Sequence, residues 1–134
     1  MTSRALSLTG IPWKVGGRDR GGVDCLGLAL LAQRELFGRI IEDVWHYGES
    51  TYQAVSLTAP VDLLMLGAVE VPQPLDGDVA FLLLRGYGHL STVVGEGLLT
   101  IFEGSRSLWR KPGRTLPFRY FRFGEGEVEW ESVR

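Results

Sequence analysis

Apolar residues recur at helical spacing just after position 24 and predict the clearest helix of the chain. The apolar stripe consists of Cys25, Leu28, Ala29, Ala32 and Leu36. Asp24 stands directly before the stripe, where its carboxylate can accept hydrogen bonds from the unpaired amides of a first helical turn. Gly38 supplies a natural C-terminal stop. The pattern therefore predicts a helix that begins at the single cysteine of the sequence.

The rest of the chain divides into a second helical region and a series of strands. Residues 49–66 have helical periodicity, with Pro60 starting a new turn or a kink. From residue 68 onward, short apolar runs are separated by Gly and Pro, which is typical of strands. The runs are AVEV (68–71), DVAFLLL (78–84), HLSTVV (89–94), LLTIFE (98–103) and FRYFRF (118–123). Helices followed by neighbouring strands predict an α+β fold, with N-terminal helices packed on an antiparallel sheet.

The two ends of the chain and the glycine-rich stretch have weaker patterns. Residues 1–10 fit one helical turn in a packing arm, and four glycines in residues 11–23 favour a loop. Residues 125–134 alternate apolar and charged side chains, which fits either an edge strand or a docking tail.

Size and composition narrow the class of protein. A length of 134 residues, with 45% hydrophobic and 22% charged residues, predicts one soluble globular domain over residues 1–134. The net charge of −2 argues against a nucleic-acid partner, because phosphate binding needs a clustered basic excess. No apolar stretch is long enough to cross a bilayer, and the N-terminus lacks the pattern of an export signal, so we expect no membrane insertion and no signal peptide.

One cysteine and two histidines limit the chemistry. They exclude an internal disulfide and a multi-cysteine zinc site, and they argue against a metal cage built by the protein, so we expect no cofactor. A thiol at a helix start sees the positive end of the helix dipole, which lowers its pKa and favours a nucleophilic thiolate. The alternative is that Cys25 is a small buried hydrophobe, since the apolar stripe turns it towards the core.

The second histidine supplies a candidate partner for the thiol. Residues 89–105 predict a hairpin that turns at Gly95, Glu96 and Gly97. If Glu96 is the centre of a three-residue turn, His89 lies opposite Glu103 on one face of the sheet. Cys25, His89 and Glu103 would then form a triad of nucleophile, base and orienting carboxylate. The alternative for Glu103 is a solvated strand residue.

Residues outside this triad have two possible roles each. Trp13 can form the wall of a groove beside Cys25 or pack on the helix, and Arg18 can line the same groove or be a solvated loop charge. His46 lies between two aromatic residues in a connector, which favours a structural role.

Residues 10–30, GIPWKVGGRDRGGVDCLGLAL, and 75–97, LDGDVAFLLLRGYGHLSTVVGEG, resemble the NlpC/P60 cysteine peptidase family. The resemblance is closest to short, stand-alone members found with bacteriophage tail genes. It implies a papain-like fold and hydrolysis of amide bonds in peptidoglycan stem peptides, typically between D-glutamate and a diamino acid. By resemblance, Cys25 matches the nucleophile, His89 the base and Asp24 the acidic residue before the nucleophile.

The sequence departs from that family at three positions. Trp13 stands where a tyrosine is usual and Leu26 where a serine is usual. The third catalytic position, about a dozen residues after His89, falls near residues 100–103 and holds no histidine; strand parity selects Glu103. We expect Trp13, Asp24 and Arg18 to contact substrate, with the Cys25 amide and the Trp13 indole N–H as oxyanion donors.

Two functions fit these expectations best. The first is a tail-associated endopeptidase that opens the cell wall during phage entry, and the second is a structural tail or baseplate subunit with weak or absent catalysis. A third is an intracellular amidase or acyltransferase. The expected partners are peptidoglycan stem peptides and tail or baseplate hub proteins. The expected location of the protein is the virion tail. We expect the protein to be made in the host cytoplasm and to act at the cell wall.

Overall fold

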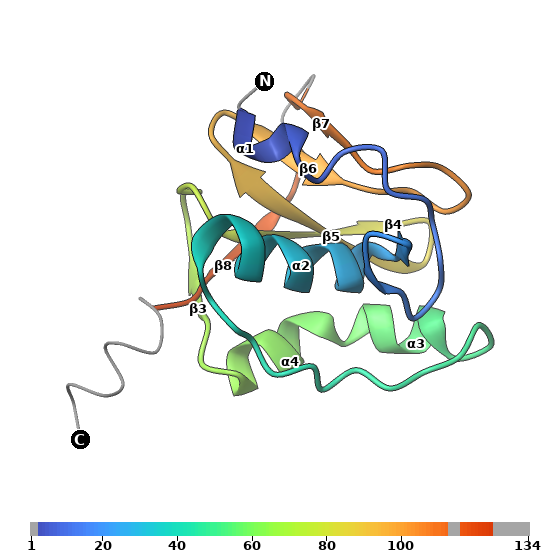
Figure 1. Ribbon diagram of the computed structural model, residues 1–134. Helices are drawn as coiled ribbons and strands as arrows, with labels where there is room; N and C mark the ends of the chain where they lie inside the picture. The colour runs from blue at the N-terminus through green and yellow to red at the C-terminus, as the bar shows by residue number, and fades with distance from the viewer. Residues whose placement is uncertain (1–2, 113–115, 125–134) are drawn as a thin grey trace.

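The second half of the chain forms an antiparallel sheet in the computed structural model, which describes residues 3–112 and 116–124 (Figure 1). Its strands are β3 (Val69–Val71), β4 (Val79–Leu84), β5 (Tyr87–Val94), β6 (Gly97–Thr100), β7 (Leu108–Arg110) and β8 (Arg119–Arg122). Their order is β3-β8-β4-β5-β6-β7, so β8 returns to lie between β3 and β4. The runs predicted as strands all contribute to this sheet.

The helices precede the sheet in the sequence. They are α1 (Ser3–Leu6), α2 (Cys25–Phe37), α3 (Tyr52–Leu57) and α4 (Ala59–Met65). Figure 1 shows α2 running across the sheet, with α3 and α4 beside it. Pro60 lies at the start of α4, where a missing backbone N–H leaves no helical hydrogen bond unmade. The predicted α+β class, the helix at Cys25 and the second helical region are confirmed.

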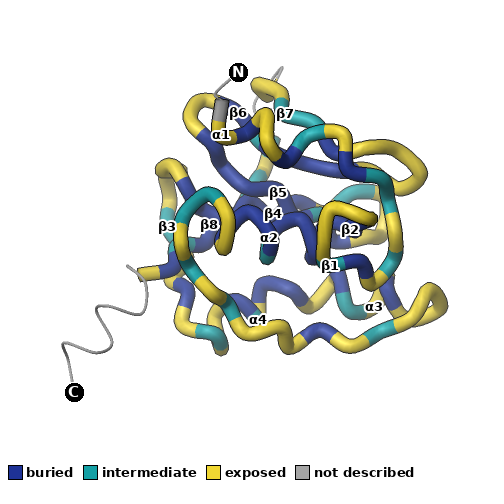
Figure 2. Tube along the Cα trace, viewed as in Figure 1, coloured by how far each residue is buried: buried dark blue, intermediate teal, exposed yellow. Residues whose placement is uncertain are grey.

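Strand parity divides the sheet into two faces. Phe81 and Leu90 pair across β4 and β5 and are both buried in the core with α2, whose residues Leu26 and Leu28 are also buried. Figure 2 shows the buried residues concentrated along α2 and the central strands. Side chains at the intervening positions, such as Leu82, point to the opposite face, because successive residues of a strand alternate. We call these the helix face and the reverse face.

Three parts of the fold differ from the sequence-based expectation. The glycine-rich stretch is not only a loop, since β1 (Arg18–Asp19) pairs with β2 (Gly22–Val23). Glycine at position 17 permits this close approach, because a side chain there would collide with the Gly22 carbonyl. Strand β7 was not predicted. The hairpin between β5 and β6 has a turn of two residues rather than three, since Val94 pairs with Gly97.

Residues 125–134, predicted as an edge strand or docking tail, lie outside the described residues. Among the residues that are described, no helix has the length and apolar character needed to cross a membrane.

Candidate functional site

Cys25 is the first residue of α2, and the helix start is built by Asp24. One Asp24 oxygen accepts from the Gly27 amide at 2.8 Å and the other from the Gly16 amide at 2.7 Å. At the other end, Gly38 adopts a left-handed conformation with φ 66°. Both predicted caps are confirmed, and they fix where the thiol enters the core.

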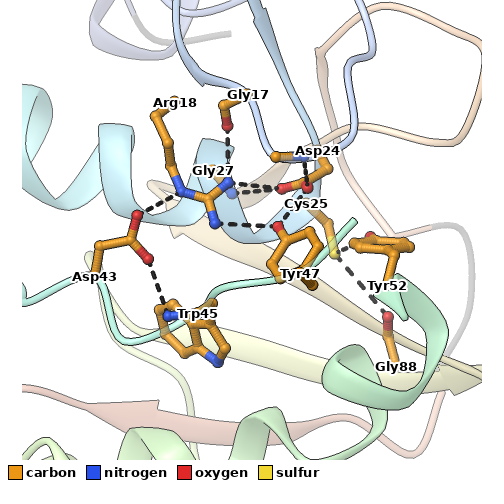
Figure 3. A network of polar contacts seen from close by, with 11 residues as sticks. Gly17, Arg18, Asp24, Cys25, Gly27, Asp43, Trp45, Tyr47, Tyr52 and Gly88 are labelled. Carbon is orange, nitrogen blue, oxygen red and sulfur yellow. Dashed lines mark hydrogen bonds and ion pairs between the residues drawn. The ribbon is translucent and has the colours of Figure 1, made fainter. Parts of the chain in front are cut away.

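The thiol of Cys25 is sealed inside the protein. Its side chain faces Tyr52 of α3, with Sγ 2.9 Å from the Tyr52 hydroxyl and 4.0 Å from the Gly88 carbonyl oxygen (Figure 3). The residue is 2% exposed. Burial raises the pKa of the thiol to about 11, although the hydrogen bond with Tyr52 acts in the opposite direction. The expected low pKa of a thiol at a helix start is therefore wrong here, because desolvation outweighs the dipole.

His89 lies on β5 but faces away from Cys25. It pairs with Leu82, and its ring stacks on Phe102 with centroids 4.8 Å apart. Its neighbour Leu90 occupies the helix face, so the imidazole belongs to the reverse face. Burial lowers the pKa of His89 to about 4. The predicted contact between sulfur and imidazole is therefore wrong in this structure, since the sheet separates them.

Glu103 does not orient His89. The two-residue turn pairs Thr92 with Leu99, and the same register continues to place Phe102, not Glu103, opposite His89. Glu103 lies in an exposed turn. The polar partner of His89 is Thr100, whose Oγ1 lies 2.6 Å from the imidazole Nε2. The predicted triad fails because a one-residue change of register moves every side chain to the other face.

Asp24 and Arg18, both expected to contact substrate, are bonded to each other and to neighbouring residues. Arg18 donates to Asp24 at 3.3 Å, to Asp43 at 2.8 Å and to the Tyr47 hydroxyl at 3.1 Å (Figure 3). Tyr47 in turn donates to Asp24. Burial and the hydrogen bond to the Asp24 carboxylate raise the pKa of Tyr47. This network stabilises the loop in front of α2.

A hollow of about 370 Å³ opens beside this network. Its lining residues are Gly16, Arg18, Asp43, Trp45, His46 and Tyr47. His46 is exposed and Cys25 is not part of the lining. The hollow therefore offers polar and aromatic groups to a ligand but gives no direct path to the sulfur.

Trp13 packs against Tyr52, the residue whose hydroxyl contacts the Cys25 thiol. It is half-buried and packs edge-on against Tyr52, with centroids 5.7 Å apart and an interplanar angle of 84°. Tyr52 is the functional neighbour that sequence reasoning missed, because the helical pattern of residues 49–66 does not indicate which side chain reaches the thiol. Gly88 is the sequence feature connected with this contact. A side chain at Gly88 would collide with the Ser56 carbonyl, so glycine lets α3 approach β5.

Comparisons with known proteins show the fold. No family model matches the sequence, and no curated protein matches it. Among solved structures, the crystal structure of the NlpC/p60 domain of the peptidoglycan hydrolase SagA is similar, with a TM-score of 0.54 and 19% sequence identity. The match covers 81% of this chain and 84% of that one. This likeness confirms the predicted NlpC/P60, papain-like fold. Within residues 3–112 and 116–124, no group of three or more His, Cys, Asp and Glu side chains is arranged to hold a metal ion.

Proposed function

We propose that this chain, which has the NlpC/p60 fold, is a phage or phage-like tail component that acts at the bacterial cell wall as a structural subunit. The sequence resemblance over residues 10–30 and 75–97 supports the tail assignment. The separation of Cys25 and His89 onto opposite faces of the sheet supports the absence of hydrolysis, and it is the observation that carries this proposal.

The chemistry of thiol hydrolysis explains why this separation matters. A cysteine nucleophile needs a base within hydrogen-bonding reach of its sulfur, directly or through one water. The Cys25 sulfur instead has Tyr52 as its hydrogen-bond partner. With a thiol pKa of about 11 and a His89 pKa of about 4, both groups are neutral at pH 7. A thiolate–imidazolium pair is therefore not favoured in this conformation.

The second candidate is a cysteine endopeptidase that cleaves stem-peptide amide bonds, between D-glutamate and a diamino acid. It is favoured by the position of Cys25 as the first residue of a capped helix and by the fold shared with a peptidoglycan hydrolase domain. In this candidate, Cys25 attacks the scissile carbonyl and His89 protonates the leaving amine, while Trp13, Asp24 and Arg18 contact the substrate. It requires β5 to change its pairing by one residue, which breaks the bond between His89 and Thr100.

Digestion of purified peptidoglycan separates the two candidates. Wild type and Cys25→Ser are incubated with the substrate alongside an active peptidoglycan endopeptidase, and released fragments are identified by mass. The structural proposal expects no fragments from either form of this chain. Fragments released by wild type and not by Cys25→Ser would replace it with the endopeptidase. Mass spectrometry of purified tail particles tests the tail assignment, and absence of the chain from them would overturn it.

A further inference from the structure

A hollow lies on the reverse face of the sheet, away from α2 and the thiol. Its volume is about 470 Å³, which is within the range of small-molecule sites. The apolar part of its lining comes from strands β4 and β6 and from residues outside the strands: Leu82, Leu84, Leu98, Phe102, Pro112, Leu116 and Phe118. An apolar cavity of this size can enclose the body of a small hydrophobic ligand.

A chain of polar side chains lies in this apolar lining. The Ser91 hydroxyl donates to Thr100 Oγ1 at 3.0 Å, and Thr100 Oγ1 lies 2.6 Å from His89 Nε2. Ser91 and Thr100 are each 3% exposed. The Thr100 oxygen therefore joins Ser91 to the imidazole of His89, and these polar groups bond to one another within the apolar lining.

Among the described residues that line this cavity, Arg110 is the one with a full positive charge. It pairs with Leu98 across β6 and β7, so both side chains share the reverse face. Within residues 3–112 and 116–124, its guanidinium makes no ion pair. An arginine at the edge of an apolar cavity fits a carboxylate, which it can bind through two parallel hydrogen bonds.

We propose that this cavity binds a small apolar molecule that ends in a carboxylate, with Arg110 at the carboxylate and the leucine and phenylalanine side chains around its body. The site is separate from the thiol and from the proposed tail role. A neutral apolar ligand would leave the guanidinium unused, and a highly charged one would place polar groups against the apolar lining.

Calorimetric titration with decanoate and decanol tests the site, because the two probes share a chain length and differ in charge. We expect decanoate to bind wild type at one site. Arg110→Gln should bind decanoate about tenfold or more weakly, while its affinity for decanol stays unchanged. Arg34→Gln, on the exposed side of α2, is the matched control and should bind decanoate like wild type.

Leu98→Trp locates the ligand, because the larger ring fills the cavity. Binding of both probes should be lost while circular dichroism stays that of wild type. Absence of decanoate binding to wild type, or equal affinity of wild type and Arg110→Gln for decanoate, would overturn the proposal. The arginine variant decides the question even if the tryptophan variant does not fold, since Arg110 is exposed.

Discussion

At the scale of single residues, burial determines the charge state of the two groups that the sequence singled out. A rise in the Cys25 pKa from 9.0 to about 11 corresponds to about 3 kcal/mol. A helix dipole contributes only about 0.3–1 kcal/mol at a typical site. Desolvation therefore has the larger effect at Cys25. It also acts on His89, whose neutral form is favoured.

The pKa of His89 makes the free energy of unfolding sensitive to acid. Its value falls from 6.5 to about 4 in the folded protein, so its contribution is fully present above pH 6.5 and is lost as the pH falls through 4. The full effect is about 3 kcal/mol. Urea unfolding at pH 7, 5.5 and 4 should show a smaller loss of stability in His89→Phe than in wild type.

His46→Gln is the matched control for this measurement, because His46 is exposed. The free energy of unfolding of His46→Gln should change with pH as that of wild type does. An unchanged acid sensitivity in His89→Phe would contradict the burial of the imidazole on the reverse face.

At the scale of elements, the start of α2 depends on a single buried carboxylate. Asp24 is fully buried and accepts hydrogen bonds from the Gly16 and Gly27 amides, from Arg18 and from Tyr47. A helix cap is worth about 1 kcal/mol, and each buried polar group left without a partner costs about 1–3 kcal/mol more. The local sequence predicted the cap, whereas the bonds to Arg18 and Tyr47 come from the tertiary structure.

Asp24→Ala should lower the free energy of unfolding by about 3 kcal/mol or more, because it removes the cap and leaves Arg18 and Tyr47 without their buried acceptor. Asp43→Ala is the control, since it removes the other carboxylate partner of Arg18 at a site that is 39% exposed. Its cost should stay below about 1 kcal/mol. Urea denaturation measures both values, and equal costs would show that the Asp24 network adds nothing beyond a surface ion pair.

At the scale of the whole molecule, the sheet separates two sites. The helix face holds the thiol beneath α3, and the reverse face holds the cavity with His89 and Arg110. A change at one site can therefore leave the other intact. In this chain, the pairing of β5 with β6 decides which face each side chain of the strand occupies.

Labelling of Cys25 reports whether the packing of α3 over the thiol opens. The thiol is buried and its pKa is about 11, so only a very small fraction is thiolate at pH 8. Reaction with an aromatic disulfide reagent at pH 8 should be at least about a hundredfold slower in the native protein than in urea. The rate should rise with urea in parallel with unfolding. Native labelling at the unfolded rate would instead indicate an open, accessible thiol.

The sequence by itself determined the elements whose signals are local. Asp24 and Gly38 set the ends of α2, because a cap acts on amides and carbonyls within one turn of itself. Apolar periodicity located α3, α4 and most strands. The NlpC/P60 fold was implied by the resemblance of residues 10–30 and 75–97 to that family, and the solved structure of similar fold confirms it.

Only the tertiary structure decided what surrounds the thiol and which face holds the imidazole. Tyr52 reaches Cys25 from 27 positions away, and no local pattern encodes that contact. The face of His89 follows from strand pairing, and the two-residue turn after Val94 removed its predicted pairing with Glu103. Strand side chains alternate with a period of two, so an error of one residue in the predicted register places each side chain on the wrong face of the sheet. The prediction of a helix cap or an apolar stripe does not depend on strand register.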